Sequence, residues 1–191
     1  MKPTTFDILD KHLEEERDKL LKGHAQSVHR TYKKDLIINP LYWNDYYPLL
    51  NKYSFTWTEF KYQDVATKAV DFDTVVTTTS TGVYLFIVKA KNLIADCPKY
   101  VIYVGIAGEN DSRRSLKERL IEYFSLSGIK KRHKVHTFLY EYYEDVYINY
   151  SPMNLPPDEL CEIEENLHGF FCPPANERDY PIGIKKLIKA W

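Results

Sequence analysis

Two apolar runs in the middle of the chain have the composition of paired β-strands. They are Thr81–Val88 and Tyr100–Gly105, and both are rich in β-branched and aromatic residues. The stretch between them contains Asn92, Asp96 and Pro98, which are residue types common in loops. The sequence therefore predicts that the two runs form a β-hairpin.

Helical patterns lie on both sides of this hairpin. Residues 4–23 carry apolar side chains at helical spacing, with oppositely charged residues three or four apart. After the second run, Ser115 and Glu118 have the spacing of a capping box, which predicts a helix over 113–126 that ends near Gly128. The basic run 130–134 that follows is expected in a loop.

The rest of the chain mixes strand and helix. Residues 145–150 alternate like a strand, Pro157 opens a helix that runs to about Phe170, and residues 182–191 form a short last helix. The aromatic segment 38–62 contains Pro and Asn, has no clear period and is expected to be irregular. These changes in pattern place a boundary near 70–80.

The charges of the chain are balanced overall but segregated along it. The net charge of -1 over 191 residues argues against a uniformly polybasic nucleic-acid binder. Residues 111–134, however, hold eight Lys or Arg against three acids, whereas residues 135–177 hold nine acids and no Lys or Arg. This segregation is compatible with phosphate binding on one side and a cation site facing it.

The sequence also predicts where the protein is found. Its three cysteines are too few for a disulfide framework and favour a reducing cytoplasm. The charged N-terminus lacks the apolar core of a signal peptide, and no window approaches the roughly 18 apolar residues that span a bilayer. We therefore expect a soluble cytoplasmic protein with no membrane contact.

A carboxylate at the border of an apolar stripe draws attention to the helix that begins near Pro157. Leu160 and Ile163 belong to the stripe, and helical geometry places Glu164 beside it while Glu162 and Glu165 point to solvent. A carboxylate at such a border is paired, bound to a metal ion or simply extended into water.

The helix expected over 113–126 has a comparable cation. Arg119 and Tyr123 are four residues apart, so they are neighbours on one helix face, beside the buried Leu120. Arg119 either points along the core toward a site or makes a surface ion pair with Glu122, which would stabilise the fold little.

Four short segments of the chain form an ordered pattern. They are Gly82-Val83-Tyr84, Tyr103-Val104-Gly105, the segment 119–124, and the segment 164–176, in which Glu164 precedes Asn176 by twelve residues. The pattern resembles the GIY-YIG nuclease family, with Gly-Val-Tyr and Tyr-Val-Gly standing where the family has Gly-Ile-Tyr and Tyr-Ile-Gly. The resemblance covers roughly residues 80–177.

The resemblance implies an α+β fold in which helices flank a small three-stranded antiparallel sheet. It divides the chain into an N-terminal helical and aromatic extension (1–75), a nuclease domain (76–180) and a short C-terminal helix (181–191). It also implies a divalent-metal-dependent endonuclease that hydrolyses phosphodiester bonds in DNA, with Mg²⁺ as cofactor and Mn²⁺ as a substitute. The implied site residues are Tyr84, Tyr103, Arg119, Tyr123, Glu164 and Asn176.

The resemblance also assigns roles that suit the residue types. Glu164 would hold the metal ion, and Arg119 would clamp the phosphate with its planar guanidinium. Tyr84 and Tyr103 would position or deprotonate the water, without a decision between them, and Tyr123 would contact the phosphate or the leaving group. Asn176 would hold the site together.

The sequence departs from the family after Tyr-Val-Gly. Many relatives carry a Lys there, but Ile106-Ala107-Gly108 follows in this chain, and the loop before Arg119 is longer. Basic residues nearby are available as substitutes and as DNA contacts. The predicted DNA-binding residues are Arg113, Arg114, Lys117, Lys130, Lys131, Arg132 and Lys134.

Several alternatives stay open. A restriction or phage-defence nuclease suits the small size best, and the rivals are a structure-specific repair nuclease and an inactive nucleic-acid-binding or assembly module. Residues 1–75 would bind DNA, form a homodimer or contact a partner. Cys161, His168 and Cys172 could suggest zinc, but a fourth ligand is not evident and the two cysteines are interpreted as core residues.

Overall fold

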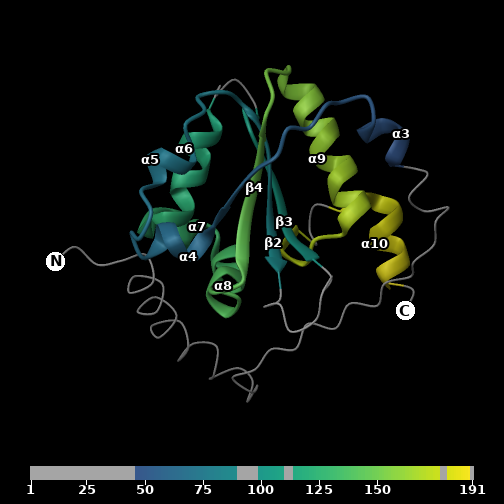
Figure 1. Ribbon diagram of the computed structural model, residues 1–191. Coiled ribbons are helices and arrows are strands. Elements are labelled where there is room, and N and C mark those ends of the chain that lie inside the picture. The colour runs from purple at the N-terminus through teal and green to yellow at the C-terminus, as the bar shows by residue number, and fades with distance from the viewer. Residues whose placement is uncertain (1–45, 90–98, 110–113, 177–179, 190–191) are drawn as a thin grey trace, which may run out of the picture.

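A four-stranded antiparallel sheet forms the centre of the protein, in the strand order β1-β4-β2-β3 (Figure 1). The computed structural model describes residues 46–89, 99–109, 114–176 and 180–189, so the helix expected over 4–23 lies outside the described residues. The strands are β1 (Thr58–Lys61), β2 (Gly82–Lys89), β3 (Lys99–Ala107) and β4 (Val146–Pro152). The α+β fold is thus confirmed, but the expectation of three strands is wrong.

The predicted hairpin is present as β2 and β3. Its register places Tyr84 opposite Gly105 and Phe86 opposite Tyr103. The strand expected near 145–150 is β4, which pairs with the other side of β2. Because β2 is covered on both edges, its backbone is held in place from both sides, and this makes Tyr84 a well-fixed position.

The additional strand comes from the segment that was expected to be irregular. β1 pairs with β4 and places Phe60 opposite Ile148. It is flanked by the short helices α3 (Tyr47–Leu50) and α4 (Tyr62–Ala66). With only four residues, β1 shows too little alternation to be recognised, and it forms because β4 offers an edge for pairing.

Helices cover both faces of the sheet (Figure 1). On one face lie α4, α5 (Phe72–Val75) and the helices between β3 and β4, packed on a core that includes Tyr84, Phe86 and Ile148. On the other face α9 (Pro157–Phe171) packs on Val83 and Leu85. The last helix, α10 (Ile182–Lys189), lies beside the end of α9.

The single helix expected over 113–126 is divided into shorter pieces. Ser115 caps α6 (Leu116–Leu120) in a complete capping box with Glu118, as predicted, but the chain then tightens into the 3-10 helix η2 (Ile121–Phe124). Ser125 is extended and ends that segment. Helix packing against the sheet therefore overrides the continuous helical pattern.

The loop expected over 130–134 is also wrong. The chain forms α7 (Leu126–Lys131) and α8 (His133–Glu141) there. Gly128 permits this path, because a Cβ atom at that position would collide with the backbone carbonyl of Glu122. In α8, Val135, Phe138 and Leu139 are buried at helical spacing.

None of the helices in the described ranges is long and apolar enough to span a membrane.

Candidate active site

Tyr84 and Tyr103 project from the hairpin on the same face of the sheet. Gly105 stands opposite Tyr84, and a Cβ atom there would lie 2.5 Å from the ring atom Cζ and from the hydroxyl oxygen of Tyr84. The missing side chain lets the Tyr84 ring lie across β3. The absence of a side chain at Gly105 thus makes room for the Tyr84 ring.

Tyr123 completes a cluster of three tyrosines. The ring centroids of Tyr84, Tyr103 and Tyr123 are 6.0, 5.9 and 6.1 Å apart in pairs. The hydroxyl groups of Tyr84 and Tyr123 are 2.8 Å apart and share a hydrogen bond, and both side chains are fully buried. The Tyr62 hydroxyl donates to the Tyr123 backbone carbonyl at 3.2 Å, which anchors η2 to this cluster.

Arg119 joins the tyrosines through its guanidinium. The capping box sets the direction of α6, and Nε of Arg119 donates to the Tyr84 hydroxyl at 3.1 Å. Arg119 and Tyr123 were expected to be neighbours on one continuous helix face. They instead lie in successive segments, α6 and η2, and both bond to the hydroxyl of Tyr84.

Two phenols of the cluster, Tyr103 and Tyr123, are held in their protonated form at neutral pH. Burial raises the pKa of Tyr103 far above that of a free phenol, Tyr84 raises it further, and a hydrogen bond with Tyr123 and the charge of Arg119 only partly offset this. Burial, followed by the two other tyrosines, also raises the pKa of Tyr123. These two groups are therefore hydrogen-bond donors, and a role as base requires an additional positive charge.

Arg119 remains a cation in this setting. Burial lowers the pKa of its guanidinium, but the surrounding tyrosines, first of all Tyr84, raise it to a net value above that of free arginine. The Arg119 guanidinium thus stays positively charged at neutral pH, as phosphate binding requires.

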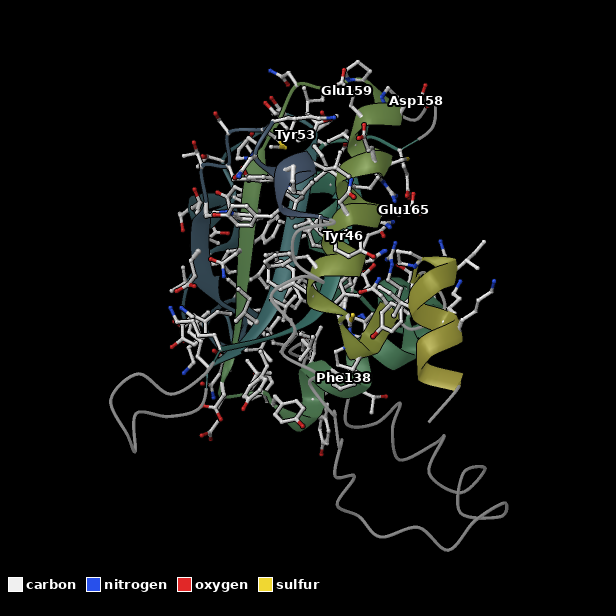
Figure 2. All side chains as sticks on the ribbon, turned by 90° about the vertical axis from the view of Figure 1, so that its right-hand side faces the viewer. Tyr46, Tyr53, Phe138, Asp158, Glu159 and Glu165 are labelled. Carbon is white, nitrogen blue, oxygen red and sulfur yellow. The ribbon has the colours of Figure 1, made fainter. Side chains whose placement is uncertain are left out.

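Glu164 lies on α9, which packs on the face of the sheet opposite to the tyrosine cluster. It is half-buried, whereas Glu162 and Glu165 are exposed (Figure 2 labels Glu165). The charge of Glu164 contributes to the raised pKa of Tyr103. Burial is the main reason that the pKa of the Cys161 thiol is raised, and the charge of Glu164 is the next.

Asn176 attaches the end of the α9 region to β3. α9 ends at Cys172, which has the left-handed φ of 43°, and the short 3-10 helix η3 (Pro174–Asn176) follows. The Asn176 side chain accepts from the Val104 N–H at 2.8 Å and donates to the Val104 carbonyl at 3.1 Å. It thereby occupies both backbone groups of the residue between Tyr103 and Gly105, as a pairing strand would.

We predict that Asn176→Ala lowers the free energy of unfolding by about 2 kcal/mol or more, since each buried polar group left unsatisfied costs about 1–3 kcal/mol. Val104 is completely buried, so water cannot replace the lost partners. Urea unfolding followed by circular dichroism measures the loss. Asn154→Ala, at an exposed position, is the matched control, and an equal small loss in both variants would contradict the prediction.

A cleft of about 440 Å³ opens beside Arg119. The segment 106–108, which stands where many GIY-YIG nucleases carry a Lys, lines this cleft together with Glu109. Arg114, Glu118 and Arg119 also line it. Two guanidinium groups thus face a space large enough for a phosphate group.

Ion pairs surround these arginines. Nη2 of Arg119 lies 3.4 Å from a carboxylate oxygen of Glu109, and Nη1 lies 3.8 Å from one of Glu122. Glu122 also pairs with Arg114 and Arg132. In the sequence, Glu122 is a possible partner of Arg119, whereas the contact with Glu109 appears only in the structure. The three-residue spacing between Arg119 and Glu122 indicated their contact. No local pattern indicated the contact between Arg119 and Glu109.

The predicted DNA-binding residues are placed differently from one another. Arg114 lies in the cleft and Arg132 lies beside Tyr123, whereas Lys117 pairs with Asp73 at 2.9 Å and Lys131 is exposed. Of the predicted DNA-binding residues that the structure describes, only Arg114 and Arg132 therefore lie at the cleft or at the tyrosine cluster. Arg113 and the side chains of Lys130 and Lys134 lie outside the described residues.

The described residues contain no group of three or more His, Cys, Asp or Glu side chains that could together hold a metal ion. Of the residues considered for zinc, Cys161 is exposed, His168 is buried, and Cys172 donates to the Gly169 carbonyl at 3.4 Å. Glu164 provides a hard oxygen ligand of the kind that Mg²⁺ accepts, because Mg²⁺ needs only one or two carboxylates alongside water and phosphate oxygens.

A scan against protein-family models and searches of curated proteins and of solved structures find no match to the chain. The resemblance to GIY-YIG nucleases consequently rests on the four sequence segments alone.

Proposed function

We propose that the protein is a divalent-metal-dependent endonuclease that hydrolyses phosphodiester bonds in DNA. The observation that carries this proposal is the hydrogen-bonded chain of Arg119, Tyr84 and Tyr123 beside a cleft. Glu164 supplies a carboxylate close enough to affect Tyr103 in the same cluster. A phosphate clamp, phenolic donors and a carboxylate are the groups that phosphodiester hydrolysis needs.

Each residue has a definite task in this proposal. Arg119 binds the non-bridging phosphate oxygens and stabilises the charge that grows on them. Tyr123 donates toward the phosphate or the leaving oxygen, while Tyr84 and Tyr103 orient the attacking water. Glu164 would hold Mg²⁺ or Mn²⁺, and the bound ion would supply Lewis-acid stabilisation of the phosphate and a more acidic water.

Tyr84 and Tyr103 have different surroundings. Tyr84 accepts a hydrogen bond from Nε of Arg119. Tyr103 is half-buried, and burial, followed by the charges of Tyr84 and Glu164, raises its pKa. Within the proposed mechanism Tyr84 is therefore the tyrosine in direct contact with the phosphate clamp.

A second candidate is an inactive nucleic-acid-binding module of the same fold. The described lining of the cleft favours it, because this lining includes the cations Arg114 and Arg119 but not Glu164. Such a module would bind DNA equally well with and without Glu164, whereas the enzyme needs this carboxylate for cleavage.

We predict that the purified protein cuts DNA in the presence of Mg²⁺ or Mn²⁺ and that EDTA abolishes cutting, because the carboxylate acts through a bound cation. The measurement is incubation with supercoiled plasmid, followed by sequencing of the ends. Fixed ends identify a restriction or defence nuclease, and ragged ends identify a structure-specific or nonspecific one. Failure to cut duplex, single-stranded and branched DNA with either metal would contradict the proposed function.

Cleavage of both DNA strands depends on whether the protein acts as a homodimer or as a monomer. A chain with a single site cuts both strands as a homodimer or through two successive nicks. Accumulation of nicked plasmid before linear plasmid would indicate successive nicks by a monomer.

A further inference from the structure

One carboxylate lies among three arginines behind the proposed phosphate clamp. Oε1 of Glu122 is 2.6 Å from Nη2 of Arg114, and Oε2 is 2.6 Å from Nη1 of Arg132. The same Oε2 is 3.8 Å from Nη1 of Arg119. Glu122 thus makes two short contacts, with Arg114 and Arg132, and one long contact, with Arg119.

The short contact with Arg132 is well fixed. The Arg132 guanidinium also lies over the Tyr123 ring, 5.2 Å from its centroid, and its side chain is 17% exposed. Glu122 is 18% exposed and Arg119 is 14% exposed. The pair is sheltered from water, so its electrostatic interactions are stronger than those of surface ion pairs.

Glu122 is charged in this environment. Burial raises the pKa of its carboxyl group, but the hydrogen bond and charge of Arg132, followed by the charges of Arg114 and Arg119, lower it to a net value below normal. A sheltered carboxylate that loses one cation turns to the nearest remaining one. Without Arg132, Oε1 of Glu122 keeps its contact with Arg114, and the cation nearest to the freed Oε2 is Arg119, three residues earlier in the chain.

We propose that Arg132 is a positioning residue that keeps Glu122 from closing on Arg119, so that a phosphate in the cleft competes with Glu109 but not with Glu122 for the Arg119 guanidinium. Arg114 pairs with the other carboxylate oxygen of Glu122 and likewise keeps Glu122 away from Arg119. This inference rests on the proposed function, because it concerns the phosphate clamp of that site. It gives Arg132 a role through Arg119 in place of direct contact with DNA.

The inference predicts a rescue that a direct phosphate contact would not show. In Arg132→Gln, Glu122 closes on Arg119, and phosphate binding weakens by about tenfold. Adding Glu122→Gln removes the competing charge, so the double variant binds within about threefold of wild type. Arg132→Lys keeps a cation beside Glu122 and stays near wild type, which makes it the matched control.

The experiment measures binding of inorganic phosphate by calorimetry, together with binding of a fluorescent DNA duplex in EDTA, for the full chain and these variants. Thermal unfolding confirms that each variant is folded. If Arg132→Gln does not fold, Glu122→Gln alone decides, because loss of the competing carboxylate should tighten phosphate binding by about threefold.

Equal weakening in Arg132→Gln and in the double variant would overturn the inference, as would unchanged binding in Arg132→Gln or absence of phosphate binding by the wild type. Cleavage is not part of this test. A wild type that binds phosphate but cuts no DNA would contradict the proposed function, while the comparison of variants would still decide the role of Arg132.

Discussion

Glu164→Gln is expected to abolish DNA cleavage while DNA binding survives. The substitution keeps the size of the side chain but removes the charge that would hold the metal ion. Loss of metal assistance is worth about 4 kcal/mol, or roughly a thousandfold in rate. The half-buried position of Glu164 at the rim of α9 limits the structural cost, and the loss of a negative charge does not weaken the attraction for phosphate.

Glu165→Gln is the matched control for this prediction. It makes the same chemical change in the next residue of α9, where the side chain is exposed (Figure 2). Cleavage of labelled duplex in Mg²⁺ and binding of the same duplex in EDTA are measured for both variants. Equal cleavage by wild type and Glu164→Gln would exclude the nuclease mechanism, and loss of binding in Glu164→Gln would move this residue from the reaction to the fold.

Gly105→Ala is expected to destabilise the protein and to disable the site, even though alanine normally favours a strand over glycine. The new methyl group would lie 2.5 Å from the distal ring atoms of Tyr84. The ring cannot retreat easily, because it packs against Tyr103 and Tyr123 and its hydroxyl is bonded to Arg119. Overpacking of this kind costs about 1–3 kcal/mol.

The cause of this effect can be isolated with a double-mutant cycle. Tyr84→Leu removes the ring atoms that the new methyl group would meet, so Gly105→Ala should cost little stability in that background. Chemical denaturation measures the four free energies of unfolding. An equal cost of Gly105→Ala in both backgrounds would show that the strand itself, and not the tyrosine ring, resists the substitution.

Local sequence signals predicted the elements that hold most of the candidate site. The hairpin follows from two β-rich runs, and the capping box of Ser115 and Glu118 correctly marks the start of α6. The stripe of α9 correctly separates half-buried Glu164 from its exposed neighbours. These features depend on residues near one another in the chain, which is why the sequence alone reveals them.

Features that depend on distant partners were missed. β1 is too short for a visible alternation and exists because it pairs with β4. The expected helix over 113–126 is divided because Tyr123 must be buried beside Tyr84, with its carbonyl held by Tyr62. Helical spacing could place Arg119 near Tyr123, but it could not indicate that both bond to a hydroxyl from another strand.

The sequence by itself determined the strands β2, β3 and β4, the helix of Glu164 and the residue types available to a phosphate site, because side-chain periodicity and capping act over a few residues. The tertiary structure alone decided which charges meet. Arg132 pairs with Glu122 ten residues away, and Asn176 bonds to Val104 seventy-two residues away. Such contacts form when the sheet and its helices bury their apolar faces together, and the ion pairs then depend on where packing leaves each charged group.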